Sequence, residues 1–89
     1  MEGHSHISPE VLARYAADAA AEVKGVHTKQ RRGAKVQGAE VEVHVVVDYG
    51  ASVPSVAAQV QRRVADYLER MTDVRPSAVH VVVDDVQRL

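Results

Sequence analysis

The chain has 89 residues, of which 46% are hydrophobic and 26% are charged, with a formal net charge of -1 and no cysteine. These values predict one globular domain, and they exclude disulfide bonds, thiolate metal sites and a strongly basic nucleic-acid-binding composition. The core must consist mainly of Val, Ala and Leu, because the chain has no Phe, no Trp and only three Tyr.

The first part of the chain predicts a tail followed by a helix. Residues 1–6 are polar, and we expect them to form a disordered tail in front of a single domain over residues 7–89. The helix should begin at Ser8 and Pro9, because Ser is a favoured N-cap and Pro suits the first helical position. Gly25 is a natural stop for it.

A basic segment follows this helix. Residues 26–32 predict a short polar strand, and residues 33–39, with two glycines, predict a turn or loose loop. The basic residues of this hairpin are Lys29, Arg31, Arg32 and Lys35. Such a cluster can contact nucleic acid or anionic lipid. A charged edge strand that resists unwanted pairing is the simpler explanation, since no aromatic residue accompanies the cluster to stack on a base.

The most informative feature of the chain is a six-residue sequence, Val-His-Val-Val-Val-Asp, that occurs at residues 43–48 and again at 79–84. Valine alternates with other residues in both copies, which is typical of a strand with one buried face. We expect Val45 and Val81 to be fully buried, and Val46 and Val82 to lie side by side on the opposite face. Asp84 and Asp85 should alternate between the two faces. The predicted interaction face comprises Glu42, His44, Val46, Asp48, His80, Val82 and Asp84.

A second helix is predicted between the two copies. Ser52 can cap it, Pro54 lies in its first turn, and Pro76 requires it to end near Thr72 and Asp73. Its apolar residues recur on one face.

The predicted order of elements is therefore α-β-β-α-β. The economical arrangement is an α+β fold, a two-layer α/β sandwich in which two helices cover one face of a three-stranded mixed sheet. We place the polar strand at an edge and pair the two repeated strands with each other. A second arrangement, in which the first strand is central and the last strand is antiparallel to it, stays open.

The chemistry of these residues argues against catalysis. His44 and His80 could ligate a metal together with Asp48, Asp84 or Glu42. Matching strand positions more often reflect a shared sheet environment, however, so we expect no metal, no cofactor and no small-molecule substrate. No Cys is present and no Ser-centred motif lies beside a histidine, so we assign no catalytic residue.

Short motifs along the chain resemble the alkaline shock protein family of envelope stress-response proteins. They are Ile-Ser-Pro-Glu-Val at residues 7–11, Ala-Ala-Glu-Val-Lys-Gly-Val at 20–26, Tyr-Gly at 49–50, Val-Gln-Arg-Arg-Val at 60–64, Met-Thr at 71–72 and Val-His-Val at 79–81. The sequence departs from the family at Asp73, where Gly is usual, and at His80, where Asn is frequent.

The resemblance implies a non-enzymatic cytoplasmic protein linked to envelope stress. It also implies self-association and, as in some members, attachment to the inner face of the membrane through a separate anchor protein. Together with the residues, it predicts a scaffolding domain that associates through the open sheet face or an exposed strand edge. The alternative is a nucleic-acid-binding module that uses the basic hairpin at residues 29–35, which the net charge disfavours.

Overall fold

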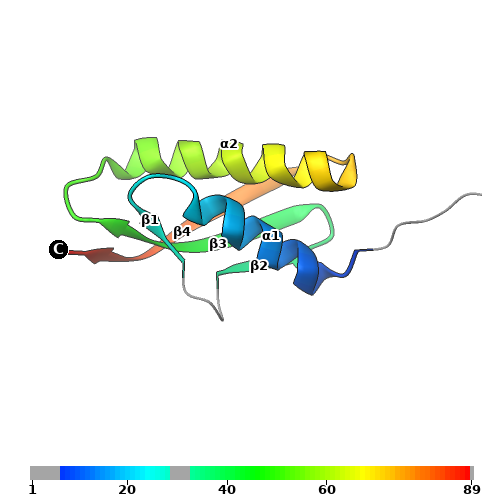
Figure 1. The fold of residues 1–89 in the computed structure, drawn as a ribbon, viewed down its shortest axis with the longest axis horizontal. Helices are drawn as coiled ribbons and strands as arrows, with labels where there is room; N and C mark the ends of the chain where they lie inside the picture. The colour runs from blue at the N-terminus through cyan, green and yellow to red at the C-terminus, as the bar shows by residue number, and fades with distance from the viewer. Residues whose placement is uncertain (1–6, 29–32, 89) are drawn as a thin grey trace, which may run out of the picture.

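The computed structural model describes residues 7–28 and 33–88. Its elements are α1 (Pro9–Ala21), β1 (Val26–His27), β2 (Ala34–Gln37), β3 (Glu40–Asp48), α2 (Val53–Thr72) and β4 (Ala78–Gln87). Figure 1 shows α1 and α2 packed together on the same side of the sheet. The predicted two-layer α+β sandwich is confirmed.

Strand β3 is the centre of the sheet. It pairs with β4 in parallel along its whole length, and with β1 and β2 in antiparallel. Since β4 occupies one edge of β3 completely, β1 and β2 lie end to end along the other edge. The sheet is therefore mixed and three strands wide. The predicted pairing of the two repeated strands is confirmed, and the arrangement with the first strand at the centre is wrong.

The segment before β3 differs from its prediction. Residues 34–37 form a strand where we expected a loop, because Ala34 and Val36 are partly buried against the core while Lys35 and Gln37 are exposed. The turn itself needs only Gly38, at φ 60°, and Ala39. Of the strand predicted over residues 26–32, Val26–His27 forms a strand and Thr28 does not. Residues 29–32 and the predicted tail at residues 1–6 lie outside the described residues.

The two predicted serine caps behave differently, and the end of α2 depends on backbone conformation. Ser8 Oγ accepts a hydrogen bond from the Val11 amide at 3.2 Å, as the predicted N-cap requires. Ser52 precedes α2, but its side chain makes no capping bond, so that predicted role is wrong. α2 ends at Asp73, whose φ of 63° is the left-handed conformation that Gly adopts most easily.

The core lies between β3 and the two helices. The inward valines of β3, at positions 41, 43, 45 and 47, are only 0–2% exposed, so the expected burial of Val45 is confirmed. Alanines of α1 allow its backbone to approach closely, and α2 contributes Val60, Val64 and Leu68. The inward valines of β4, including Val81, are only partly buried. The expectation of full burial for Val81 is wrong, because β4 is an edge strand whose helix cover comes from α2, while α1 contacts β1, β2 and β3.

Candidate functional site

The candidate site is the open face of the sheet, which is the face opposite the helices. All three histidines in the described ranges lie there, and each contacts a carboxylate. His27 Nε2 lies 2.8 Å from Asp48 Oδ1, and His80 Nε2 lies 3.3 Å from Glu40 Oε1. The alternation of each strand positions these groups, because every neighbour along the strand points into the core.

His44 is at the centre of this face. Its Nε2 lies 2.6 Å from Glu42 Oε2, and its Nδ1 lies 3.1 Å from both carboxylate oxygens of Asp84. These hydrogen bonds, first that of Glu42 and then that of Asp84, raise the pKa of His44 above its ordinary value of 6.5. The arrangement suits a charged imidazolium, because only the charged ring donates from both nitrogens.

A β-bulge in β4 brings two aspartates to this face. Val45 pairs with Val83, but Val46 pairs with Asp85, so Asp84 is one extra residue in β4. Asp84 contacts His44, and Asp85 lies opposite an outward-facing valine of β3. The expectation that these two aspartates alternate between faces is therefore wrong, because the bulge interrupts the alternation on which it depended.

The register also offsets the two repeated sequences. Val43 pairs with Val81, so His44 lies opposite Val82, and Val46 lies opposite Asp85. The expectation that Val46 and Val82 lie side by side is wrong, since they are diagonal neighbours. Both are half-buried, as expected for residues outside the core, and together they place a small apolar strip among the charged groups.

All seven residues of the predicted interaction face lie on the open face. Sequence reasoning missed His27, Glu40 and Asp85. The first two carried a usable signal, because His27 follows the buried Val26 and Glu40 shares the alternation of β3. Asp85 carried none, since a bulge has no clear signature in this valine-rich segment.

Among the described residues, the open face is acidic. Its carboxylates are Glu40, Glu42, Asp48, Asp84 and Asp85, and the lysine on it is Lys35, which pairs in register with Glu42. The other three residues of the predicted basic cluster lie outside the described residues. What the structure describes of that cluster is thus a single lysine beside carboxylates.

The geometry of His44 suits neither metal binding nor nucleophilic catalysis. Its two carboxylate partners bind opposite nitrogens of one ring, so the three groups do not converge on a common point. Within residues 7–28 and 33–88 no cluster of three or more His, Asp or Glu side chains is placed to hold a metal ion. Both ring nitrogens are engaged by carboxylates, and no hydroxyl group occupies either position.

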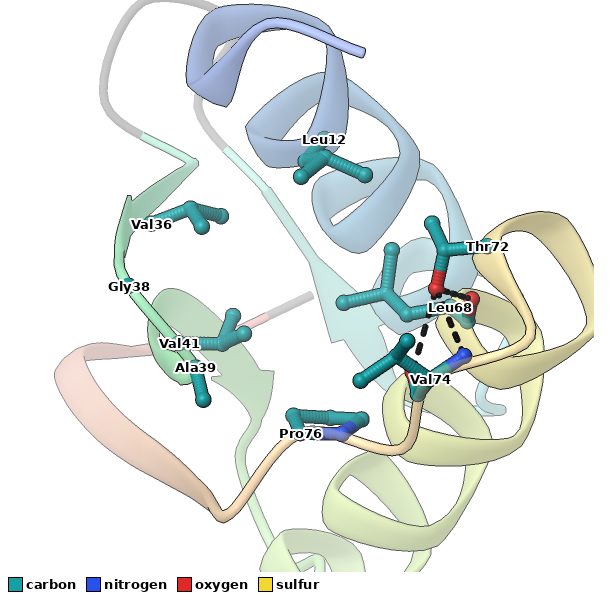
Figure 2. Close-up of a pocket in the computed structure, with 9 residues that line it drawn as sticks. All are labelled: Leu12, Val36, Gly38, Ala39, Val41, Leu68, Thr72, Val74 and Pro76. Atoms are coloured by element: carbon teal, nitrogen blue, oxygen red, sulfur yellow. Dashed lines mark hydrogen bonds between the residues drawn. The ribbon is translucent and has the colours of Figure 1, made fainter. Parts of the chain in front are cut away.

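A second feature is an apolar pocket of about 250 Å³ at one end of the sandwich (Figure 2). It is lined by Leu12, Val36, Gly38, Ala39, Val41, Leu68, Thr72, Val74 and Pro76. The Thr72 hydroxyl is already engaged, since its Oγ1 lies 2.7 Å from the Leu68 carbonyl oxygen and accepts from the Val74 amide at 3.1 Å. The pocket side chains therefore offer no free polar group to orient a substrate, and we regard it as a packing feature.

Across the described ranges, no helix is both long and apolar enough to cross a bilayer.

Comparisons with known proteins agree with the resemblance of the motifs. The model of the alkaline shock protein family, which is described as having a cell envelope-related function, matches residues 29–88. Over 96% of its length the chain is similar to the uncharacterized protein YqhY of Bacillus subtilis (strain 168), with 30% identity across 105 aligned residues and 78% of that protein covered. No solved structure matches the chain.

Proposed function

Because the chain belongs to the alkaline shock protein family, whose function is related to the cell envelope, we propose that it is a non-enzymatic interaction domain that self-associates in an envelope-linked assembly. Its work is to hold proteins together rather than to transform a substrate. The open face supports the non-enzymatic part of this proposal. Both ring nitrogens of its central histidine, His44, are engaged by carboxylates, so neither is free to act on a substrate.

The observation that carries the proposal is the incomplete cover of β4. The inward valines of β3 are 0–2% exposed, whereas the three valines that face the same way from β4 are only partly buried. Val86, near the end of β4, is 45% exposed. One copy of the chain therefore leaves apolar surface beside its own core in water, and association would cover it.

The same proposal includes the location of the protein in the cell. We place the domain in the cytoplasm, at the inner face of the membrane through a separate anchor protein. Capture of the tagged full chain from its own cells, followed by identification of co-purifying membrane proteins, tests this placement. Recovery of no membrane protein in any growth condition would contradict it.

Self-association is tested by sedimentation of the whole chain over a range of concentrations from micromolar to millimolar. We expect a reversible increase in mean mass with concentration, together with higher thermal stability in the associated form. A strict monomer at millimolar concentration would refute self-association. A parallel titration with RNA and DNA at two salt concentrations should show no binding, and binding with a steep salt dependence would instead favour the basic hairpin as the functional site.

A further inference from the structure

The free edge of β4 is the most incomplete part of the sheet. β4 is ten residues long, and in the described part of the chain it pairs with β3 alone. Exposed backbone N–H and C=O groups along a strand are a template for pairing with another strand. Natural edges are protected by charged side chains, Pro, bulges or short length. Residues 78–87 contain no Lys and no Pro, and the bulge of β4 follows Val83, so residues before it have regular strand geometry.

The sequence of β4 is that of a central strand. Its residues 79–84 repeat residues 43–48 of β3, which is paired on both edges. The same six residues therefore form one strand with two neighbours and one strand with a single neighbour. From this contrast, and resting on the self-association proposed above, we propose that the β4 edges of two copies pair in antiparallel about a two-fold axis at Val82.

Two local features restrict the length of this pairing. Gln61 of α2 donates its Nε2 hydrogen to the Val79 carbonyl at 3.1 Å, so this backbone group is already engaged. At the other end, the bulge after Val83 breaks the alternation of faces. Residues 80–83 lie between these features, and the bulged Asp84 ends the window, so the pairing spans about five residues, which is an ordinary strand length.

Within this window, charge complementarity selects one register. When Val82 lies opposite Val82 of the second copy, Val81 lies opposite Val83, and His80 lies opposite Asp84. Each dimer then contains two histidine–aspartate pairs on the open face and an apolar pair at the axis, and such cross-strand pairs favour association. A register centred on Asp84 would place two aspartates opposite each other, which is unfavourable.

The edge is a better contact than the open face. Counted over the residues that the structure describes, stacking two open faces would bring five carboxylates of one copy against five of the other, with Lys35 as the lysine on each face. Edge pairing instead sets the two acidic faces beside each other in one continued sheet. It also brings the partly buried valines of β4 against their counterparts, which covers the apolar surface that a single copy leaves exposed.

Disulfide trapping tests the register directly, because the chain has no cysteine of its own. Residues directly opposite each other in an antiparallel pair have Cα atoms about 4.5 or 5.5 Å apart, within the span of a disulfide. We expect Val82→Cys to form a covalent dimer under mild oxidation. The matched control Val46→Cys lies on the same face, one strand inward and two residues further along. The two cysteines would be separated by roughly 14 Å across three strand spacings and by about 13 Å along the strands, so they should not bond.

Charge variants at Val82 give a second test in solution. Val82→Lys and Val82→Glu each place like charges opposite each other at the axis, and each should weaken association about tenfold or more. An equimolar mixture of the two variants should restore it, because Lys then lies opposite Glu. Circular dichroism of each variant checks that the monomer is folded.

The outcomes separate this inference from the broader proposal. A wild-type chain that stays monomeric refutes both. If the wild type associates but Val82→Cys gives no more covalent dimer than Val46→Cys, or if the mixed charge variants do not recover, the edge register is refuted while self-association stands. If Val46→Lys weakens association as strongly as Val82→Lys, the open face is the contact and the edge is not.

Discussion

Two paired valines differ in burial, and replacing each of them tests how much β3 and β4 each contribute to the stability of the core. Val43 and Val81 are direct partners across β3 and β4 and face the same helix layer. Val43 is 0% exposed, whereas Val81 is only partly buried. Replacement of each by Ala removes the same atoms, so any difference between the two variants reports on their surroundings.

We expect Val43→Ala to lower the free energy of unfolding by about 2 kcal/mol. Loss of two methylene equivalents accounts for about 1.6 kcal/mol, and the cavity left in a closed site adds the remainder. Val81→Ala should cost about 1 kcal/mol or less in the monomer, because its side chain keeps contact with water. A domain of this length has a total stability of roughly 4–13 kcal/mol, so the first change is a large fraction of it.

Urea denaturation at low micromolar concentration measures both costs, and the slopes should match that of the wild type. Melting temperatures give a second reading, at about 4–8 °C per kcal/mol for a domain of this size. Equal costs for the two variants would show that β4 is as well covered as β3 and would refute the reasoning. If the edges pair, the cost of Val81→Ala should rise with protein concentration while that of Val43→Ala stays constant.

The remaining predictions concern the faces, the central histidine and the helix caps. Val45→Asp should prevent folding, because it buries an unpaired charge, whereas Val46→Asp should keep the circular dichroism spectrum of the wild type. The pKa of His44 is raised on folding, so its stabilising contribution is complete below pH 6.5 and is lost as the pH rises through the folded-state pKa. The urea midpoint of the wild type should therefore fall relative to that of His44→Gln as the pH rises above 6.5, and parallel profiles would contradict this. Ser8→Ala should cost about 1 kcal/mol through the lost cap, and Ser52→Ala should cost close to nothing; equal losses in thermal melts would show that the Ser8 bond is not what stabilises α1.

The period-two alternation of valine was sufficient to predict most of the fold. It placed the repeated strands next to each other and put all seven residues of the predicted interaction face on the open side, because a side chain's direction on a regular strand depends only on its position. It did not predict β2, where the small Ala34 and the two flanking glycines concealed the alternation.

The details that the sequence did not reveal depend on pairing between strands. The two-residue offset between the copies and the extra residue at Asp84 are properties of the β3–β4 pair. They decide that His44 contacts Asp84 and that Asp85 joins the same face. Neither strand contains a local signal for them, because both are valine-rich and both tolerate several registers.

The edge of β3 opposite β4 is paired with two short strands, β1 and β2, and this bears on the size of any assembly. β1 has two residues and β2 has four, and they pair with different parts of the same edge of β3. A sheet with a long pairable edge on each side can add copies without end, which is how fibrils grow. If the β4 edges pair as proposed, this sheet uses its single long edge in the first contact, and growth along the hydrogen-bonding direction stops at two copies.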